Sequence, residues 1–171
     1  MPVDNCPEYL SSVLAVTSFA CINRDRALMS KVLHAFISLD KVISNPMSAT
    51  MAAKLVNGVQ YIVSTKSEPS RDALKVIAIV ADRVHTCTGV MSWSEMKSAF
   101  YGFKVLSSDH PEGIKLLNRL NERVKETLGG NTVPSISLPF SMLHNMQAMN
   151  SKSITSFLQT GHTTFLGLCV I

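Results

Sequence analysis

Apolar residues recur along this chain at the three- and four-residue intervals of helices, and apolar–polar alternation is nearly absent before the tail at 165–171. Residues that begin and end helices stand between the apolar stretches. Ser48 is placed to cap one helix, and Ser92 with Glu95 has the spacing of a capping box. Gly129 and Gly130 are placed to end another helix. The pattern predicts an all-α protein.

One apolar stripe is copied along the chain at intervals of 43 or 44 residues. Aligning Ala15, Gly58, Gly102 and Asn145 brings four apolar rows into register. The rows are Tyr9, Ala52, Met96 and Pro139; Val13, Val56, Phe100 and Leu143; Val16, Val59, Phe103 and Met146; and Phe19, Ile62, Leu106 and Met149. The intervening helices repeat at 40 residues, through Leu74, Ile114 and Ile154.

A period near 43 residues lies in the HEAT and armadillo range of about 40–47 residues. A single hairpin of such a repeat cannot bury its stripe, so hairpins stack on one another. The sequence therefore predicts an α-solenoid of about four helical hairpins, with a single domain over 1–161 and an apolar C-terminal tail over 162–171. Four amphipathic helices with accidental spacing are the alternative.

The third repeat, over residues 92–128, carries the most characteristic residues. It contains Ser92–Trp93–Ser94–Glu95, then Ala99–Phe100–Tyr101–Gly102–Phe103, then Leu106–Ser107–Ser108–Asp109–His110–Pro111–Glu112. This stretch resembles the degenerate helical-hairpin tandem repeats, octotricopeptide-like or HEAT-like α-solenoids, of protist and organellar proteins. Gly58 extends the resemblance to the second repeat, whereas Asn145 departs from the glycine position in the fourth. The resemblance implies binding rather than catalysis, with RNA as the ligand of octotricopeptide-type repeats.

Composition and charge exclude several classes of protein. With 46% hydrophobic and 16% charged residues, the chain is too apolar to be intrinsically disordered. The net charge of +4 is mild, and basic residues are interspersed with acidic ones from Arg24 to Glu126. No apolar run approaches the roughly 20 residues that a membrane span needs. No presequence is visible, so we expect a soluble intracellular protein, cytoplasmic or organellar.

Catalytic and cofactor-binding motifs are missing from the sequence. It has no Walker loop, no dinucleotide-binding glycine motif, no nucleophile elbow and no zinc-protease motif. His85 and Cys87 are two residues apart, but no second pair at similar spacing completes a metal site. We therefore expect a protein that is not an enzyme and that uses no cofactor and no metal.

Two polar rows accompany the apolar stripe and form the candidate binding site. They pair Asn57 with Gln60, Tyr101 with Lys104, and His144 with Gln147 in the second, third and fourth repeats. Residues three apart share a helix face, so stacking would lay the three pairs side by side. Modular RNA-binding repeats read one base per repeat with two or three such side chains. A solvated outer face, which surface helices require, is the alternative interpretation.

The sequence therefore favours a noncatalytic helical-repeat binding module whose partner is RNA or a protein. In the second case the chain is a scaffold or a structural subunit of a larger assembly. RNA binding predicts a positively charged stripe along the polar pairs. Protein binding predicts an exposed apolar surface, for which the tail 162–171 is one candidate.

Overall fold

The computed structural model describes residues 6–63, 68–103 and 110–130. Within these ranges the helices are α1 (Glu8–Ile22), α2 (Arg26–Val42), α3 (Ala49–Gly58), α4 (Arg71–Thr86), α5 (Trp93–Phe103) and α6 (Pro111–Gly130), with a 3-10 turn η1 (Val59–Tyr61) after α3. No strand occurs in these ranges, so the expectation of an all-α protein is confirmed there. The predicted fourth hairpin and the tail 162–171 lie outside the described residues.

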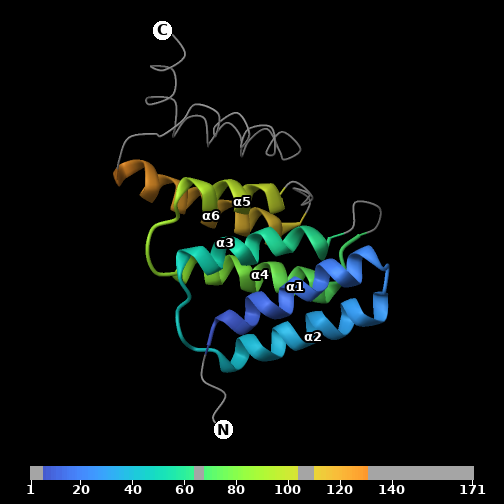
Figure 1. Cartoon of the computed structure of the whole chain (residues 1–171). Coiled ribbons are helices and arrows are strands. Elements are labelled where there is room, and N and C mark those ends of the chain that lie inside the picture. The colour runs from blue at the N-terminus through green and yellow to red at the C-terminus, as the bar shows by residue number, and fades with distance from the viewer. Residues whose placement is uncertain (1–5, 64–67, 104–109, 131–171) are drawn as a thin grey trace.

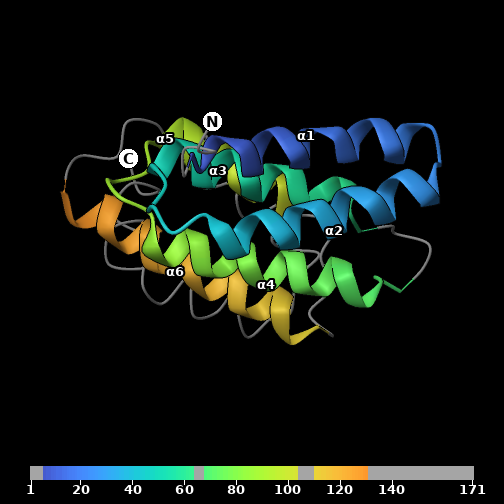
Figure 2. The same cartoon turned by 90° about the horizontal axis from the view of Figure 1, so that it is seen from below.

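The helices form two layers (Figures 1 and 2). Helices α1, α3 and α5 lie side by side in one layer, and α2, α4 and α6 lie side by side in the other. Consecutive helices run in opposite directions, so each layer contains parallel helices. The chain is therefore built as three helical pairs over its described part, α1–α2, α3–α4 and α5–α6, placed one on the next.

The core fills the space between the two layers. Phe36, Val56, Val76, Phe100 and Leu117, one from each of five helices, are all at most 1% exposed. The predicted stripe is buried in the second and third pairs, through Ala52, Val56, Val59 and Ile62 in α3 and after it, and through Met96 and Phe100 in α5. Burial of each large apolar side chain contributes about 1.5–3 kcal/mol to folding.

The first helix buries a different face from the one that the repeat predicts. Tyr9, Val16 and Phe19 are 47%, 42% and 62% exposed. The buried residues of α1 are Leu10, Leu14, Thr17 and Ala20. Because α1 is apolar around most of its circumference, the sequence offers two stripes one residue apart. Leu14 is selected because it packs against Gly58 of α3, and the Thr17 hydroxyl is satisfied by the carbonyl of Leu14.

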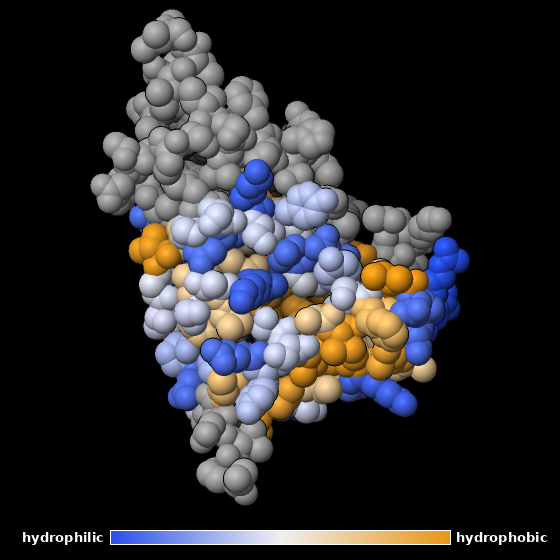
Figure 3. All heavy atoms as spheres, in the orientation of Figure 1, coloured by the Kyte–Doolittle hydropathy of each residue, from blue (hydrophilic) through white to orange (hydrophobic). Residues whose placement is uncertain are grey.

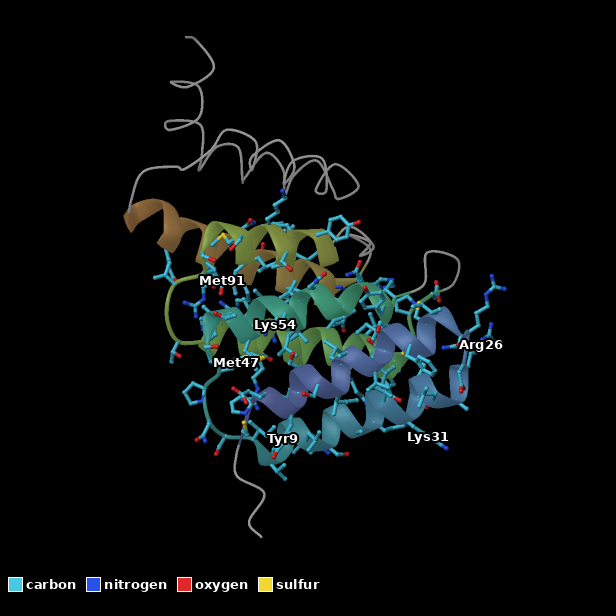
Figure 4. The ribbon with its side chains drawn as sticks, in the orientation of Figure 1. Tyr9, Arg26, Lys31, Met47, Lys54 and Met91 are labelled. Carbon is cyan, nitrogen blue, oxygen red and sulfur yellow. The ribbon has the colours of Figure 1, made fainter. Side chains whose placement is uncertain are left out.

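Helices α3 and α5 begin in the same way, 44 residues apart. The Ser48 hydroxyl accepts a hydrogen bond from the Met51 amide at 3.3 Å. The Glu95 amide donates to the Ser92 hydroxyl at 3.4 Å, and the Glu95 carboxylate accepts from the Ser92 amide at 2.7 Å. Both predicted caps are therefore confirmed. Met47 and Met91 come directly before these serines, are each 1% exposed, and lie at the same end of the molecule (Figure 4).

Glycine allows α3 and α5 to approach closely. A Cβ atom at Gly102 would lie 2.5 Å from the Asn57 Cα atom and 2.5 Å from the Val56 carbonyl oxygen. A Cβ atom at Gly58 would lie 2.6 Å from a methyl carbon of Leu14 in α1. The glycine row found in the sequence therefore marks a helix contact that recurs between successive pairs. Ala15, the first member of that row, is exposed because no described helix precedes α1.

An arginine on α4 binds the carboxyl end of α2. The Arg83 guanidinium donates to the carboxylate of Asp40 at 2.7 Å and to the backbone carbonyls of Asp40 at 3.1 Å and Asn45 at 3.2 Å. It also donates to the carbonyl of Ile43. The last carbonyls of a helix have no partner within it, and their dipoles favour a cation. Arg83 supplies both the donors and the charge.

An arginine on α6, 40 residues later, binds the carboxyl end of α4 in the same way. Arg123 donates to the carbonyls of Val84 at 3.0 Å, His85 at 2.8 Å and Cys87 at 2.8 Å. The Arg83 and Arg123 side chains are only 13% and 12% exposed. We call these two contacts the arginine clamps. They repeat with the 40-residue spacing that the sequence shows between Leu74 and Ile114, in the second helices of the second and third pairs.

Replacing Gly102 by alanine should lower the free energy of unfolding by about 1–3 kcal/mol, because the new methyl group meets backbone atoms that cannot rotate away. Gly58→Ala should cost less, because its methyl group meets side-chain atoms of Leu14 rather than backbone atoms. Urea denaturation measures both. Lys97→Ala, on the exposed side of α5, is the matched control. Equal stability of Gly102→Ala and Lys97→Ala would contradict the close approach.

Removing an arginine clamp should destabilise the fold more than removing a surface arginine from the same helix. Arg123→Met leaves three carbonyls without their donor and should cost about 2–3 kcal/mol. Arg119→Met is the control, because Arg119 is 29% exposed and pairs with Glu122 only three residues away. It should cost less than about 1 kcal/mol. Thermal denaturation measures the stability of the two variants. An equal loss of stability in both would show that the clamp does not stabilise the fold.

The capping box of α5 should make stability depend on pH. A hydrogen bond from the Thr50 side chain, aided by the bonds from Ser92, lowers the pKa of Glu95 below its usual 4.5. A depressed folded-state pKa means that this stabilisation is present above the usual value and is lost as pH falls through the folded value. Glu95→Gln should therefore be less stable than the parent at pH 7, and the difference should shrink as the pH is lowered below 4. A difference in urea midpoint that is independent of pH would contradict this.

Candidate functional site

The first predicted pair, Asn57 and Gln60, is brought together at the end of α3. The Gln60 side-chain amide donates to the Asn57 side-chain oxygen at 2.7 Å and to the Asn57 carbonyl at 3.0 Å. Both side chains are partly buried. Asn57 also lies under Gly102, where α5 presses against α3. Much of the hydrogen-bonding capacity of this pair is thus used inside the fold, as part of the helix contact.

The second predicted pair is described only in part. Tyr101 lies on α5 next to Gly102 and is 50% exposed. Lys104, His144 and Gln147 lie outside the described residues. The contact of Gly102 with Asn57 places Tyr101 on the helix adjoining the first pair, as stacking requires. The side-by-side arrangement of all three pairs stays a prediction.

A groove of about 910 Å³ opens at the end of the molecule where α1 turns into α2. Gln60 and Tyr61 of the 3-10 turn form part of its wall, and the α1–α2 turn faces them. The remaining lining residues are Ala20, Cys21, Arg24, Asp25, Arg26, Met29, Ser30, Leu33, Ile62, Val63, Glu68, Pro69, Ser70 and Asp72. This volume is within the usual range of small-molecule pockets, about 300–1,000 Å³.

The charges around this groove are mixed. Arg24 and Arg26 are balanced by Asp25, Glu68 and Asp72. Two of these carboxylates have structural partners as well. Asp25 accepts from the Leu28 amide at 2.9 Å and caps α2, and Asp72 lies 3.4 Å from His34 and 3.3 Å from Lys75. Among the described residues that line it, the groove therefore has no excess of the positive charge that attracts a phosphate backbone.

An apolar face lies on the outside of α1, where the sequence had predicted that Tyr9, Val16 and Phe19 belong to the core. Tyr9, Val16, Phe19 and Ile22 on this face are between 42% and 76% exposed. Figure 3 shows apolar side chains gathered over α1 on this side of the molecule. We call this set, together with Ser12 and Ala15 between them, the α1 outer face. The signal available in the sequence was the near-uniform apolarity of α1, which leaves apolar residues outside whichever face is buried.

Titratable groups show structural rather than catalytic features in the described part of the chain. Burial raises the pKa of the Cys87 thiol, and this opposes its conversion to a thiolate. Hydrogen bonding from Arg119 lowers the pKa of Glu122, with a smaller effect of His85. No group of three His, Cys, Asp or Glu side chains in the described ranges could hold a metal ion. His85 and Cys87, two residues apart in sequence, therefore lack the further ligands that a metal site requires.

Comparison of the chain with protein-family models, curated proteins and solved structures gives no match. Among the described helices, none has the length and apolarity needed to cross a membrane.

Proposed function

We propose that this chain is a noncatalytic helical-repeat module, an α-solenoid, that binds a protein partner through the α1 outer face. The solenoid part of the proposal is supported by three contacts that recur between successive helical pairs: the arginine clamps, the glycine contacts at Gly58 and Gly102, and the Met–Ser helix starts. Contacts that recur at a fixed spacing are what a stack of equivalent units produces.

The single observation that carries the protein-binding proposal is the exposure of the α1 outer face. In repeat proteins the terminal units need a polar outer side to stay soluble. Here the outer side of α1 carries Tyr9, Val16, Phe19 and Ile22 instead. An exposed apolar area of this kind is typical of a protein interface. It also matches the surface that the sequence analysis expects for a scaffold or a subunit of a larger assembly.

RNA binding is the second candidate, and Tyr101 favours it. Its ring is half-exposed on the helix next to Asn57 and Gln60, where a base could stack. The charge distribution supports this candidate less. Arg83 and Arg123 bind helix ends, and the lining of the groove contains three carboxylates, those of Asp25, Glu68 and Asp72, beside Arg24 and Arg26.

Affinity purification from cells that express the chain, with and without nuclease, should separate the two candidates. Protein binding predicts partners that survive nuclease, persist in a Tyr101→Ala variant and are lost with Phe19→Glu, because a charge in an apolar interface must be desolvated. Val90→Glu is the matched control, because Val90 is also 61% exposed but lies in the α4–α5 connection. It should retain the partners.

RNA binding predicts the opposite pattern. Crosslinked RNA would be recovered, would disappear with nuclease and would fall with Tyr101→Ala, whose stacking contributes about 1–3 kcal/mol. Phe19→Glu would leave it unchanged. If the parent chain and the three variants, Phe19→Glu, Val90→Glu and Tyr101→Ala, all bind neither protein nor RNA, the binding-module proposal is contradicted.

A further inference from the structure

We propose that the α1 outer face binds the same face of a second copy of this chain, with the two α1 helices antiparallel. This inference rests on the proposed function, because it names the protein that the exposed face recognises. It is argued from the spacing of the exposed residues, their sizes and the charges at the two ends of the helix.

The exposed residues lie in a narrow seam along α1. Ser12, Ala15, Phe19 and Ile22 follow one another at intervals of three, four and three residues, which is the spacing of a coiled-coil seam. All four are exposed. Tyr9 and Val16 flank the seam, each turned about 140–160° away from Leu14, the residue that packs on α3. The seam therefore points away from the remainder of the fold.

The seam is confined to α1 because the neighbouring helix of the same pair is polar on its outside. Exposed positions on α2 include Lys31, His34 and Lys41. A partner must therefore be a single helix of matching length that lies along α1. The α1 seam contains no Lys or Arg, and Glu8 is the only charge in the helix. A matching partner is therefore an apolar, nearly uncharged helix, and α1 of a second copy is such a helix.

Residue size favours the antiparallel arrangement. The α1 outer face runs from Tyr9 to Ile22, so its midpoint falls between Ala15 and Val16, and Ser12 and Phe19 lie at equal distances on either side of it. A two-fold axis there sets Phe19 of each copy level with Ser12 of the other, so that a large side chain meets a small one twice. Ala15 lies beside the axis, where a small side chain permits close approach. A parallel pair would instead oppose Phe19 to Phe19.

Charge favours the same arrangement. Glu8 is at the amino end of α1, and Arg24 is two residues beyond its carboxyl end at Ile22. Figure 4 shows the two ends of the α1–α2 hairpin, with Tyr9 at one and Arg26 at the other. The same two-fold axis sets Glu8 of one copy level with Asn23 and close to Arg24 of the other, at both ends of the pair. A parallel pair would place Glu8 against Glu8 and Arg24 against Arg24, which is repulsive.

The helix is about 22 Å long, because 15 residues each rise 1.5 Å. A contact along one such helix buries less than the roughly 800 Å² per partner of a standard interface. The dimer should therefore be weak, with dissociation in the micromolar range, and should depend on protein concentration.

Sedimentation of the full chain between about 1 and 500 µM tests the inference. We expect a shift from monomer to dimer across this range. Phe19→Glu should weaken the dimer at least about tenfold, and Val90→Glu should leave it unchanged. Circular dichroism and melting temperature show whether each variant is folded. A monomer at every concentration, or a dimer that Phe19→Glu does not weaken, overturns the inference.

Disulfide trapping tests the direction of the helices. In a background of Cys6→Ser, Cys21→Ser and Cys169→Ser, copies carrying Ser12→Cys are mixed with copies carrying Phe19→Cys. Antiparallel pairing predicts that the mixture crosslinks and that neither variant crosslinks alone. Crosslinking of each variant with itself would indicate parallel helices and overturn the inference.

The two proposals fail in distinguishable ways. A monomeric chain that captures another protein through Phe19 overturns self-association and leaves the protein-binding function in place. A monomeric chain that Phe19→Glu destabilises indicates that Phe19 is covered within the same chain, which overturns both. A dimer weakened by Phe19→Glu supports self-association whether or not other partners are found.

Discussion

The arrangement of the helices depends on the arginine clamps. The carboxyl ends of α2 and α4 lie close to the next helical pair, and their last carbonyls have no partners within their own helices. Arg83 reaches back from α4 to the end of α2, and Arg123 reaches back from α6 to the end of α4. Each guanidinium offers several donors in a fixed plane, which a lysine could not reproduce. The clamps therefore fix the position of each helical pair relative to the next one, and they also stabilise the contact between them.

The two layers of the fold repeat at different intervals. In the layer of α2, α4 and α6, the clamps and the buried residues Ile77 and Leu117 recur at 40 residues. In the layer of α1, α3 and α5, Met47 and Met91, Ser48 and Ser92, and Gly58 and Gly102 recur at 44. The helices in each layer keep equivalent contacts, so the difference falls in the connections within the pairs. Connections at the surface tolerate such differences in length at little cost.

Most of the described fold could be predicted because its signals are local. The sequence identifies the helix starts at Ser48 and at Ser92 with Glu95, since a cap depends on residues three positions apart. The glycine row was also visible in the sequence. Position 102 requires glycine because only a hydrogen atom fits above the backbone at Asn57. The clamps were not foreseen, because an arginine that binds carbonyls some 40 residues away leaves no local pattern. Their 40-residue spacing in the sequence was the available signal.

The orientation of α1 could not be predicted from its own residues. Both of its candidate stripes are mainly apolar, and the buried one even includes Thr17; Gly58 favours it by leaving room for Leu14 on the neighbouring helix. The candidate site shows the same limit. Asn57 and Gln60 were predicted as one of three pairs on a binding surface, and their spacing alone does not show that the Gln60 amide donates to the Asn57 side-chain oxygen or that Asn57 lies under Gly102 of α5.

Helix α1 lies at one edge of the described helices, so this packing choice decides which residues that edge exposes. In α3, apolar residues on both sides are covered, by α1 on one side and by α5 on the other. Helix α1 has α3 on one side only among the described residues, yet its sequence is as apolar as if it were covered on both. Burying Leu14 rather than Val16 does not reduce the apolar surface of the helix; it only decides which residues are exposed. A helix with this composition at an edge keeps an apolar face available to a partner, and the alternation of small and large residues along it determines which helices can fit there.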